Sequence, residues 1–136
     1  MKAVIDINVL IYDTFRDSVF HDKARSLLDR LEEWIIPLIV IYEYVWFMKG
    51  LGMDTKSSVE KAKEYLLQPK SDVIVEEVSD LIKALDLISF EGLSLSRFND
   101  EVVLSIASKI GCIATFDDKL RKQALARGLI VLPQEI

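Results

Sequence analysis

The chain has very few of the residues on which several common chemistries depend. Its 136 residues include one cysteine, Cys112, and one histidine, His21. A single cysteine excludes an internal disulfide. One cysteine and one histidine are also too few ligands for a zinc site of the usual nitrogen and sulfur kind. The five glycines are scattered, and the sequence has neither a glycine-rich phosphate loop nor a serine nucleophile motif. The chemistry that remains available is that of the carboxylates.

Long hydrophobic runs and long basic runs are also missing. The longest apolar stretch, 34–48, is interrupted by Pro37 and Glu43 and is shorter than the ~20 residues that span a bilayer. No linker or low-complexity tract divides the sequence. We therefore expect one soluble, cytoplasmic domain over residues 1–136, without a signal peptide. The net charge of −5 predicts weak general affinity for nucleic acid, with selectivity coming from substrate shape.

Hydrophobic periodicity predicts an alternation of short strands and helices. Short apolar runs predict strands, and longer stretches between helix start and stop residues predict helices. We expect strands at 2–6, 34–36, 72–75, 112–115 and 129–132, and helices at 8–16, 21–32, 38–49, 55–68, 79–90, 100–110 and 117–127. Helices between such strands form right-handed crossovers, which favour a parallel sheet covered on both faces. The predicted fold class is therefore α/β, with three α/β/α layers.

Two aspartates directly follow predicted strands. Asp6 comes at the end of the first apolar run, and Asp117 follows the strand at 112–115. Because ligands of open α/β sheets bind at the carboxyl ends of strands, both positions favour a functional site. Each also has an ordinary structural explanation, Asp6 as a turn residue and Asp117 as a helix N-cap.

Two further acids lie on predicted helices. Glu43 falls in the helix at 38–49, where nearly every neighbour is apolar, and we expect that helix to be buried on most sides. A buried carboxylate is strongly unfavourable unless it is paired or binds a metal. Asp100 opens the helix at 100–110, where an acid is ordinary because it complements the helix dipole. Asp100 therefore gains a functional meaning only as a member of a set.

The set of four acids indicates a site for a divalent metal. Like charges about 4 Å apart repel by roughly 4 kcal/mol at an effective dielectric of about 20, so clustered carboxylates need protons or cations. Hard Mg²⁺ or Mn²⁺ ions suit a site made only of oxygen ligands. Such ions activate water and stabilise charge on phosphoryl oxygens, which favours phosphodiester hydrolysis. The members of this set are Asp6, Glu43, Asp100 and Asp117.

The order and spacing of these motifs resemble the PIN domain family. Asp6-Ile7-Asn8-Val9-Leu10-Ile11 follows the first strand, Glu43 lies on a major helix, Asp100 begins a later helix, and Thr115-Phe116-Asp117 follows a strand. The similarity covers essentially the whole chain. It is closest to the small toxin ribonucleases of prokaryotic toxin–antitoxin pairs.

This resemblance implies a metal-dependent ribonuclease with an RNA substrate and an antitoxin protein as partner. It implies that the first and fourth strands lie side by side and that the four acids hold Mg²⁺ or Mn²⁺. By the same comparison, Asn8 and Thr115 orient the carboxylates or bound water. The resemblance leaves open whether the neighbouring Asp118 assists Asp117 in metal contact or takes its place.

Positive and aromatic side chains give weaker signals. Lys49, Arg97 and Lys119 are candidates for guiding phosphates toward the metal, although a solvated helix face is the simpler explanation for each. The aromatic residues between positions 34 and 47 favour a core or a subunit interface over base stacking. A helix that is apolar nearly all round exceeds what so small a domain can bury, so we predict a homodimer or a higher homo-oligomer.

Two other functions stay open on the sequence alone. An aspartate-based phosphatase or phosphotransferase would use Asp6 as its nucleophile, but the usual second acid two residues later is Asn8 here. The other is a non-catalytic module, either a phospho-accepting receiver or a PIN-like binding subunit. A receiver needs paired acids near Asp6, and a subunit without activity would lack part of the acidic set, which this chain keeps.

Overall fold

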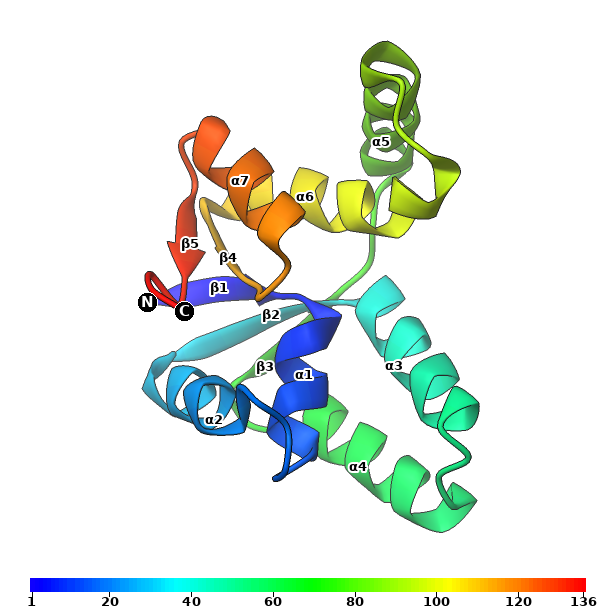
Figure 1. Cartoon of the computed structure of the whole chain (residues 1–136), viewed down its shortest axis with the longest axis vertical. Coiled ribbons are helices and arrows are strands. Elements are labelled where there is room, and N and C mark those ends of the chain that lie inside the picture. Colours follow the sequence, from blue (N-terminus) through cyan, green and yellow to red (C-terminus); the bar gives the residue numbers. More distant parts are fainter.

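A computed structural model describes all residues, 1–136, as a five-stranded sheet with helices on both faces (Figure 1). Every strand pair is parallel, and the spatial order is β3-β2-β1-β4-β5. The strands are β1 (Lys2–Ile5), β2 (Glu33–Pro37), β3 (Ser71–Ile74), β4 (Cys112–Ala114) and β5 (Ile130–Leu132). The helices are α1 (Ile7–Thr14), α2 (His21–Arg30), α3 (Leu38–Gly50), α4 (Thr55–Leu67), α5 (Val78–Glu91), α6 (Phe98–Ile110) and α7 (Asp118–Ala126), and the 3-10 turn η1 (Leu95–Arg97) precedes α6. The predicted three-layer α/β/α class is confirmed.

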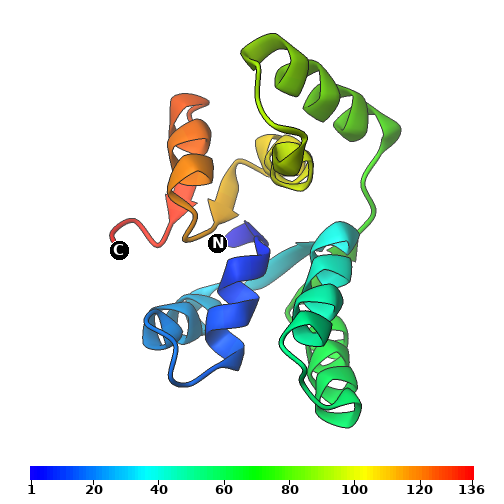
Figure 2. The same ribbon diagram turned by 45° about the vertical axis from the view of Figure 1, so that its right-hand side comes forward.

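The helices divide into two groups around the sheet. Helices α1 to α4 lie on one side of it, and α6 and α7 lie on the other (Figure 1). Helix α5 packs on α6, further from the sheet (Figure 2). None of these helices combines the length and the apolar surface that crossing a membrane requires.

The two central strands β1 and β4 are fully covered on both faces. Val4 and Ile5 of β1 and Ile113 and Ala114 of β4 have no exposed surface, and they belong to a hydrophobic core of 31 buried residues. Strands covered on both faces are apolar, which explains why residues 3–5 and 112–114 are all apolar, whereas the charged Lys2 lies at the exposed start of β1. The first polar side chain after each run is therefore placed at the edge of the sheet.

The register of β1 and β4 decides which side chains meet at that edge. Val4 pairs with Ile113 and Ile5 with Ala114, and the N–H of Asp6 donates to the carbonyl of Ala114 at 3.0 Å. Asp6 consequently lies beside Thr115, the residue that follows β4. The expectation that the first and fourth strands are neighbours is confirmed.

All predicted elements are present, and their ends differ from the predicted ones by at most two residues. One difference concerns the site. Helix α6 begins at Phe98, directly after η1, so Asp100 lies within the first turn and does not open the helix. The predicted start at Asn99-Asp100 was wrong because Ser94 already begins a turn by accepting a hydrogen bond from the N–H of Ser96.

Helix α3 is not buried on most sides, which corrects a second expectation. Val40, Ile41, Tyr44 and Met48 face the core, because α1, α4 and β2 pack against that side of the helix. The rest of the helix surface is largely exposed, although much of it is apolar too. Its exposed residues are Tyr42 (58% exposed), Val45 (51%), Trp46 (66%) and Phe47 (37%).

Candidate active site

The four acids predicted as a set lie at the carboxyl edge of the sheet, and each comes from a different element. Asp6 caps α1 by accepting from the N–H of Ile7 at 2.8 Å, and Asp117 caps α7 by accepting from the N–H of Leu120 at 2.8 Å. Glu43 lies in α3, and Asp100 lies in the first turn of α6. The predicted N-cap role of Asp117 is thus observed, and Asp6, predicted as a turn residue, is a helix N-cap as well.

Asp6 is held by a network of short-range donors. The Thr115 hydroxyl donates to its Oδ2 at 2.7 Å, and Nδ2 of Asn8 donates to the same oxygen at 3.1 Å. The Thr115 oxygen in turn accepts from the N–H of Asp117 at 3.1 Å. Asn8 accepts from the N–H of Phe116 at 2.9 Å, which joins the ends of β1 and β4. Asn8 and Thr115 therefore both contact the Asp6 carboxylate directly.

Burial and mutual repulsion raise the pKa of the two most enclosed acids. Desolvation raises the pKa of Asp6 to about 6, against the lowering effect of the Thr115 hydrogen bond, and the charges of Asp100 and Asp117 add to the rise. Desolvation also raises the pKa of Glu43 to about 7; the charges of Asp6 and Asp100 raise it further, and Asn99 opposes them. These mutual effects mean that the four carboxylates form one electrostatic cluster.

Arg97 is the cation of this cluster, and of the four acids it lies close to Asp100 and Asp117 only. Its Nη1 lies 3.2 Å from Oδ2 of Asp100 and 3.9 Å from Oδ1 of Asp117. No ion pair reaches Asp6 or Glu43. Desolvation raises the pKa of Asp100 as well, although Arg97 lowers it. The negative charge of the cluster is therefore balanced only in part.

The side chains that hold Arg97 are Glu101 and Gln123, which the sequence analysis did not identify. The Arg97 guanidinium donates from Nη2 to Oε1 of Gln123 at 2.7 Å and lies 3.8 Å from Oε1 of Glu101. Gln123 donates from Nε2 to that same Glu101 oxygen at 2.7 Å. Arg97 is three residues before Asp100 and four before Glu101, which is the spacing of ion pairs on a helix and could have indicated the group. Nothing in the sequence signals Gln123.

The donors of the site fit a hard divalent cation in kind. No three or more His, Cys, Asp or Glu side chains are close enough together to enclose a metal ion as they stand. All ligands on offer are carboxylate oxygens, and Asp6 and Glu43 have raised pKa values and no cationic partner. A bound Mg²⁺ or Mn²⁺ ion would supply the missing positive charge. The chemistry of the residues thus agrees with the predicted metal.

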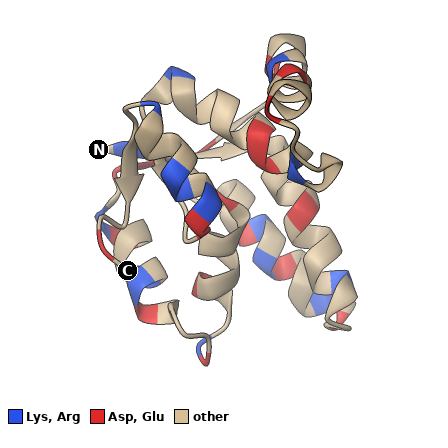
Figure 3. Cartoon of the chain, turned by 45° about the horizontal axis from the view of Figure 1, so that its top comes forward, with Lys and Arg blue, Asp and Glu red and all other residues tan.

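The remaining candidates lie at the rim of the cluster or outside it. Asp118 is exposed in the first turn of α7, and it is not among the charges that raise the pKa of Asp6, Glu43 or Asp100. Lys49 is exposed at the end of α3, where its Nζ lies 4.6 Å from the ring centroid of Trp46. Lys119 lines a pocket together with Arg97, on a helix with several basic residues (Figure 3). Of the two lysines predicted to guide phosphates, Lys119 is the one that lines a pocket with Arg97.

The parallel sheet and the carboxylates at its edge define a small α/β domain with an all-oxygen site between β1 and β4. The model of the PIN domain family matches residues 3–125. The chain belongs to the PIN domain family, as its motifs indicated. No curated protein sequence matches the chain.

Three solved structures with the same fold come from bacteria. VapC20 of Mycobacterium tuberculosis, described as a toxin that cleaves the sarcin–ricin loop, superposes with a TM-score of 0.76 at 15% identity, covering 94% of this chain and 96% of that one. VapBC2 of Rickettsia felis, bound to promoter DNA, gives 0.71 at 17% identity, covering 96% and 97%. FitAcB of Neisseria gonorrhoeae gives 0.65 at 16% identity, covering 96% of each chain. At these identities the likeness concerns the fold.

Proposed function

We propose that the protein is a metal-dependent ribonuclease, which hydrolyses RNA phosphodiester bonds as the toxin of a toxin–antitoxin pair. The observation that carries the proposal is the pair Asp6 and Glu43. Both carboxylates are desolvated beside further acids, and neither has a cationic partner. Membership of the PIN domain family and the shared fold with a toxin described as cleaving the sarcin–ricin loop support RNA as the substrate.

The residues that would hold the ion are Asp6, Glu43, Asp100 and Asp117. The chemistry that Mg²⁺ or Mn²⁺ supplies in such sites is charge stabilisation at phosphoryl oxygens and activation of water. Thr115 and Asn8 fix the orientation of the Asp6 carboxylate, because both donate to its Oδ2. Since the pKa of Asp6 is raised to about 6 and that of Glu43 to about 7, cation binding below these pH values displaces protons from the two groups.

An antitoxin protein and a second copy of the chain are the proposed partners. The antitoxin follows from the likeness to VapBC2 and FitAcB, which are toxin–antitoxin complexes. The homodimer follows from the exposed side of α3, where Tyr42, Val45 and Trp46 are more than half exposed. Apolar side chains that gather on one exposed surface favour a protein–protein interface.

A non-catalytic binding module is the second candidate, and one observation favours it. Arg97 already pairs with Asp100 and lies near Asp117, and no three acids enclose a metal position. A phosphatase that uses Asp6 as its nucleophile gains no support, because Oδ1 and Oδ2 of Asp6 accept three hydrogen bonds and the side chain is 2% exposed.

The test compares two adjacent aspartates. Asp117→Asn removes a carboxylate of the cluster but keeps the helix cap, since asparagine caps as well as aspartate. Asp118→Asn removes the same charge one residue later, on the exposed surface. We expect cleavage of labelled structured RNA in Mn²⁺ by the wild type and by Asp118→Asn, with loss in Asp117→Asn and in EDTA. Equal cleavage by all three proteins, or no cleavage by the folded wild type, would favour the non-catalytic binding module over the ribonuclease.

A further inference from the structure

A pocket of about 500 Å³ lies beside the acidic cluster, between the segment after α5 and helix α7. Ser94 and Ser96 line it from the η1 side, and Lys119, Lys122 and Gln123 line it from α7. Arg97 lines it as well, and the same guanidinium contacts Asp100. The pocket therefore begins where the acidic cluster ends.

The pocket is positively charged in a chain whose net charge is −5. Its charged lining residues are three cations, Arg97, Lys119 and Lys122, and one acid, Glu91. Both lysines are exposed, and neither belongs to any ion pair of the structure. Two unpaired ammonium groups and serine hydroxyls in one pocket are ligands for a phosphate group.

Arg97 is built into this position. Its side chain is only 14% exposed, and Gln123 accepts from its Nη2. Glu101 lies behind it with a fully buried side chain, and its Oε2 has no hydrogen-bond partner. A buried carboxylate is tolerated when a cation lies close, so Glu101 and Arg97 stabilise each other. Arg97 is thereby held between the acids and the pocket, where its delocalised guanidinium suits phosphate oxygens.

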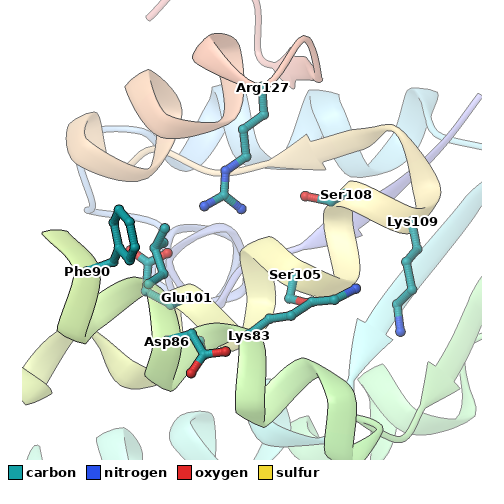
Figure 4. Close-up of a pocket in the computed structure, with 10 residues that line it drawn as sticks. Lys83, Asp86, Phe90, Glu101, Ser105, Ser108, Lys109 and Arg127 are labelled. Atoms are coloured by element: carbon teal, nitrogen blue, oxygen red, sulfur yellow. The ribbon is translucent and has the colours of Figure 1, made fainter.

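A second groove of about 560 Å³, between α5 and α6, offers less to an anion. Figure 4 shows Lys83, Lys109 and Arg127 around it. Lys109 forms an ion pair with Asp80, at 3.0 Å. The acids Asp86 and Glu101 also line the groove. Two acids therefore accompany three cations in the lining of the groove, whereas one acid accompanies three cations in the pocket beside Arg97.

We propose that the pocket lined by Arg97, Lys119 and Lys122 binds a backbone phosphate of the RNA strand, adjacent to the phosphate that is cleaved. This proposal rests on the proposed ribonuclease function. Arg97 forms the border between the two positions, since it contacts the acids with one nitrogen and lines the pocket. The two lysines bind the strand without reaching the reacting atoms, so they act on substrate affinity.

The experiment compares two double variants that lose the same charge. Lys119→Gln with Lys122→Gln alters the pocket, and Lys83→Gln with Arg127→Gln alters the α5–α6 groove. Binding of a short single-stranded RNA is measured by fluorescence anisotropy in EDTA over a salt series, and steady-state cleavage is measured in Mn²⁺. Each phosphate contact to a single strand contributes about 0.7 to the slope of log K against log salt concentration.

For the pocket variant we expect the salt slope to fall by about 0.7, the affinity to fall about tenfold, and KM to rise with kcat unchanged. The groove variant keeps the wild-type values. Equal effects in both variants would mean that only the net charge of the protein matters, and this would overturn the proposal. Wild-type behaviour of the pocket variant would overturn it as well. A folded wild type that neither binds nor cleaves RNA overturns the ribonuclease function together with the pocket. Mn²⁺-dependent cleavage with no difference between the variants overturns the pocket alone.

Discussion

Replacing Glu43 with glutamine should stabilise the metal-free protein at alkaline pH. In the wild type, Glu43 ionises in a partly buried place beside Asp6 and Asp100, and the folded state is penalised for that charge. Glutamine keeps the size of the side chain and removes the charge. Most substitutions destabilise a protein, so a gain in stability would be a specific sign of electrostatic strain in the cluster.

The magnitude follows from the pKa of Glu43, which rises from 4.5 to about 7 on folding. A raised carboxyl pKa means that the folded state binds the proton more tightly than the unfolded chain. The corresponding stability is fully present below pH ~4.5 and is lost as the pH rises through ~7. One pKa unit corresponds to about 1.4 kcal/mol, so full burial would give a loss of about 3 kcal/mol. Glu43 is only partly buried, and solvent screening reduces this value, so we expect about 2 kcal/mol of the loss between pH ~5 and pH ~8.

The assay is urea unfolding of the wild type and of Glu43→Gln in EDTA at these two pH values. We expect the difference in unfolding free energy to move in favour of the variant by about 2 kcal/mol from the lower to the higher pH. Glu60→Gln, on the exposed surface of α4, is the matched control and should show no such change. Saturating Mn²⁺ should restore the advantage of the wild type, since a ligand at 100 times its dissociation constant adds about 2.7 kcal/mol.

The reasoning is refuted if the difference between the two proteins is the same at both pH values. It is refuted equally if Glu43→Gln is the less stable protein at the higher pH without metal. Either result would mean that Glu43 is hydrated in the folded state and that its charge adds nothing to the cluster.

Three further predictions concern the same site and the surface of α3. The affinity for Mn²⁺, measured by calorimetry, should rise between pH ~5 and pH ~8, because Asp6 and Glu43 release protons over that range; a flat profile would contradict metal binding at these acids. Thr115→Val should lower the unfolding free energy by about 1–3 kcal/mol, since it removes a donor to Asp6 inside the protein; wild-type stability in urea would contradict the network. Tyr42→Ser with Trp46→Ser should abolish self-association in sedimentation experiments and change monomer stability by less than ~0.5 kcal/mol; a wild-type monomer would remove the basis for the proposed dimer.

The positions of Asp6 and Asp117 could be predicted from the sequence because two local rules act together. Apolar runs identify the strands, and polar residues at the ends of parallel strands come to one edge. The adjacency of β1 and β4 was implied by the family resemblance, since periodicity does not give strand order. Glu43 was found for a reason that holds only in part: its helix is apolar, but the side of α3 with Tyr42 and Trp46 is exposed. Hydrophobic composition predicts that a surface needs a neighbour, and it does not tell whether that neighbour is in the same chain.

The contacts of Arg97 show what local patterns leave out. The spacing of Arg97, Asp100 and Glu101 is readable along one helix, but Gln123 reaches Glu101 across the packing of α6 against α7. That contact depends on how two helices lie against each other, which no short motif encodes. The same packing brings Lys119 and Lys122 beside Arg97. The basic pocket could therefore not be predicted from the sequence either.

The placement of charge around Arg97 bears on how an acidic chain could hold a polyanion. Four carboxylates at one edge repel a phosphate until cations neutralise them, and Arg97 neutralises only the side of Asp100 and Asp117. On the proposed function, the metal supplies the positive charge at Asp6 and Glu43. Lys119 and Lys122 supply positive charge in the adjacent pocket. The RNA would then meet positive charge next to the site, although the chain as a whole has a net charge of −5. Such an arrangement would combine the weak general affinity for nucleic acid that the net charge predicts with a higher affinity for the substrate, and the salt series on the two double variants tests for that difference.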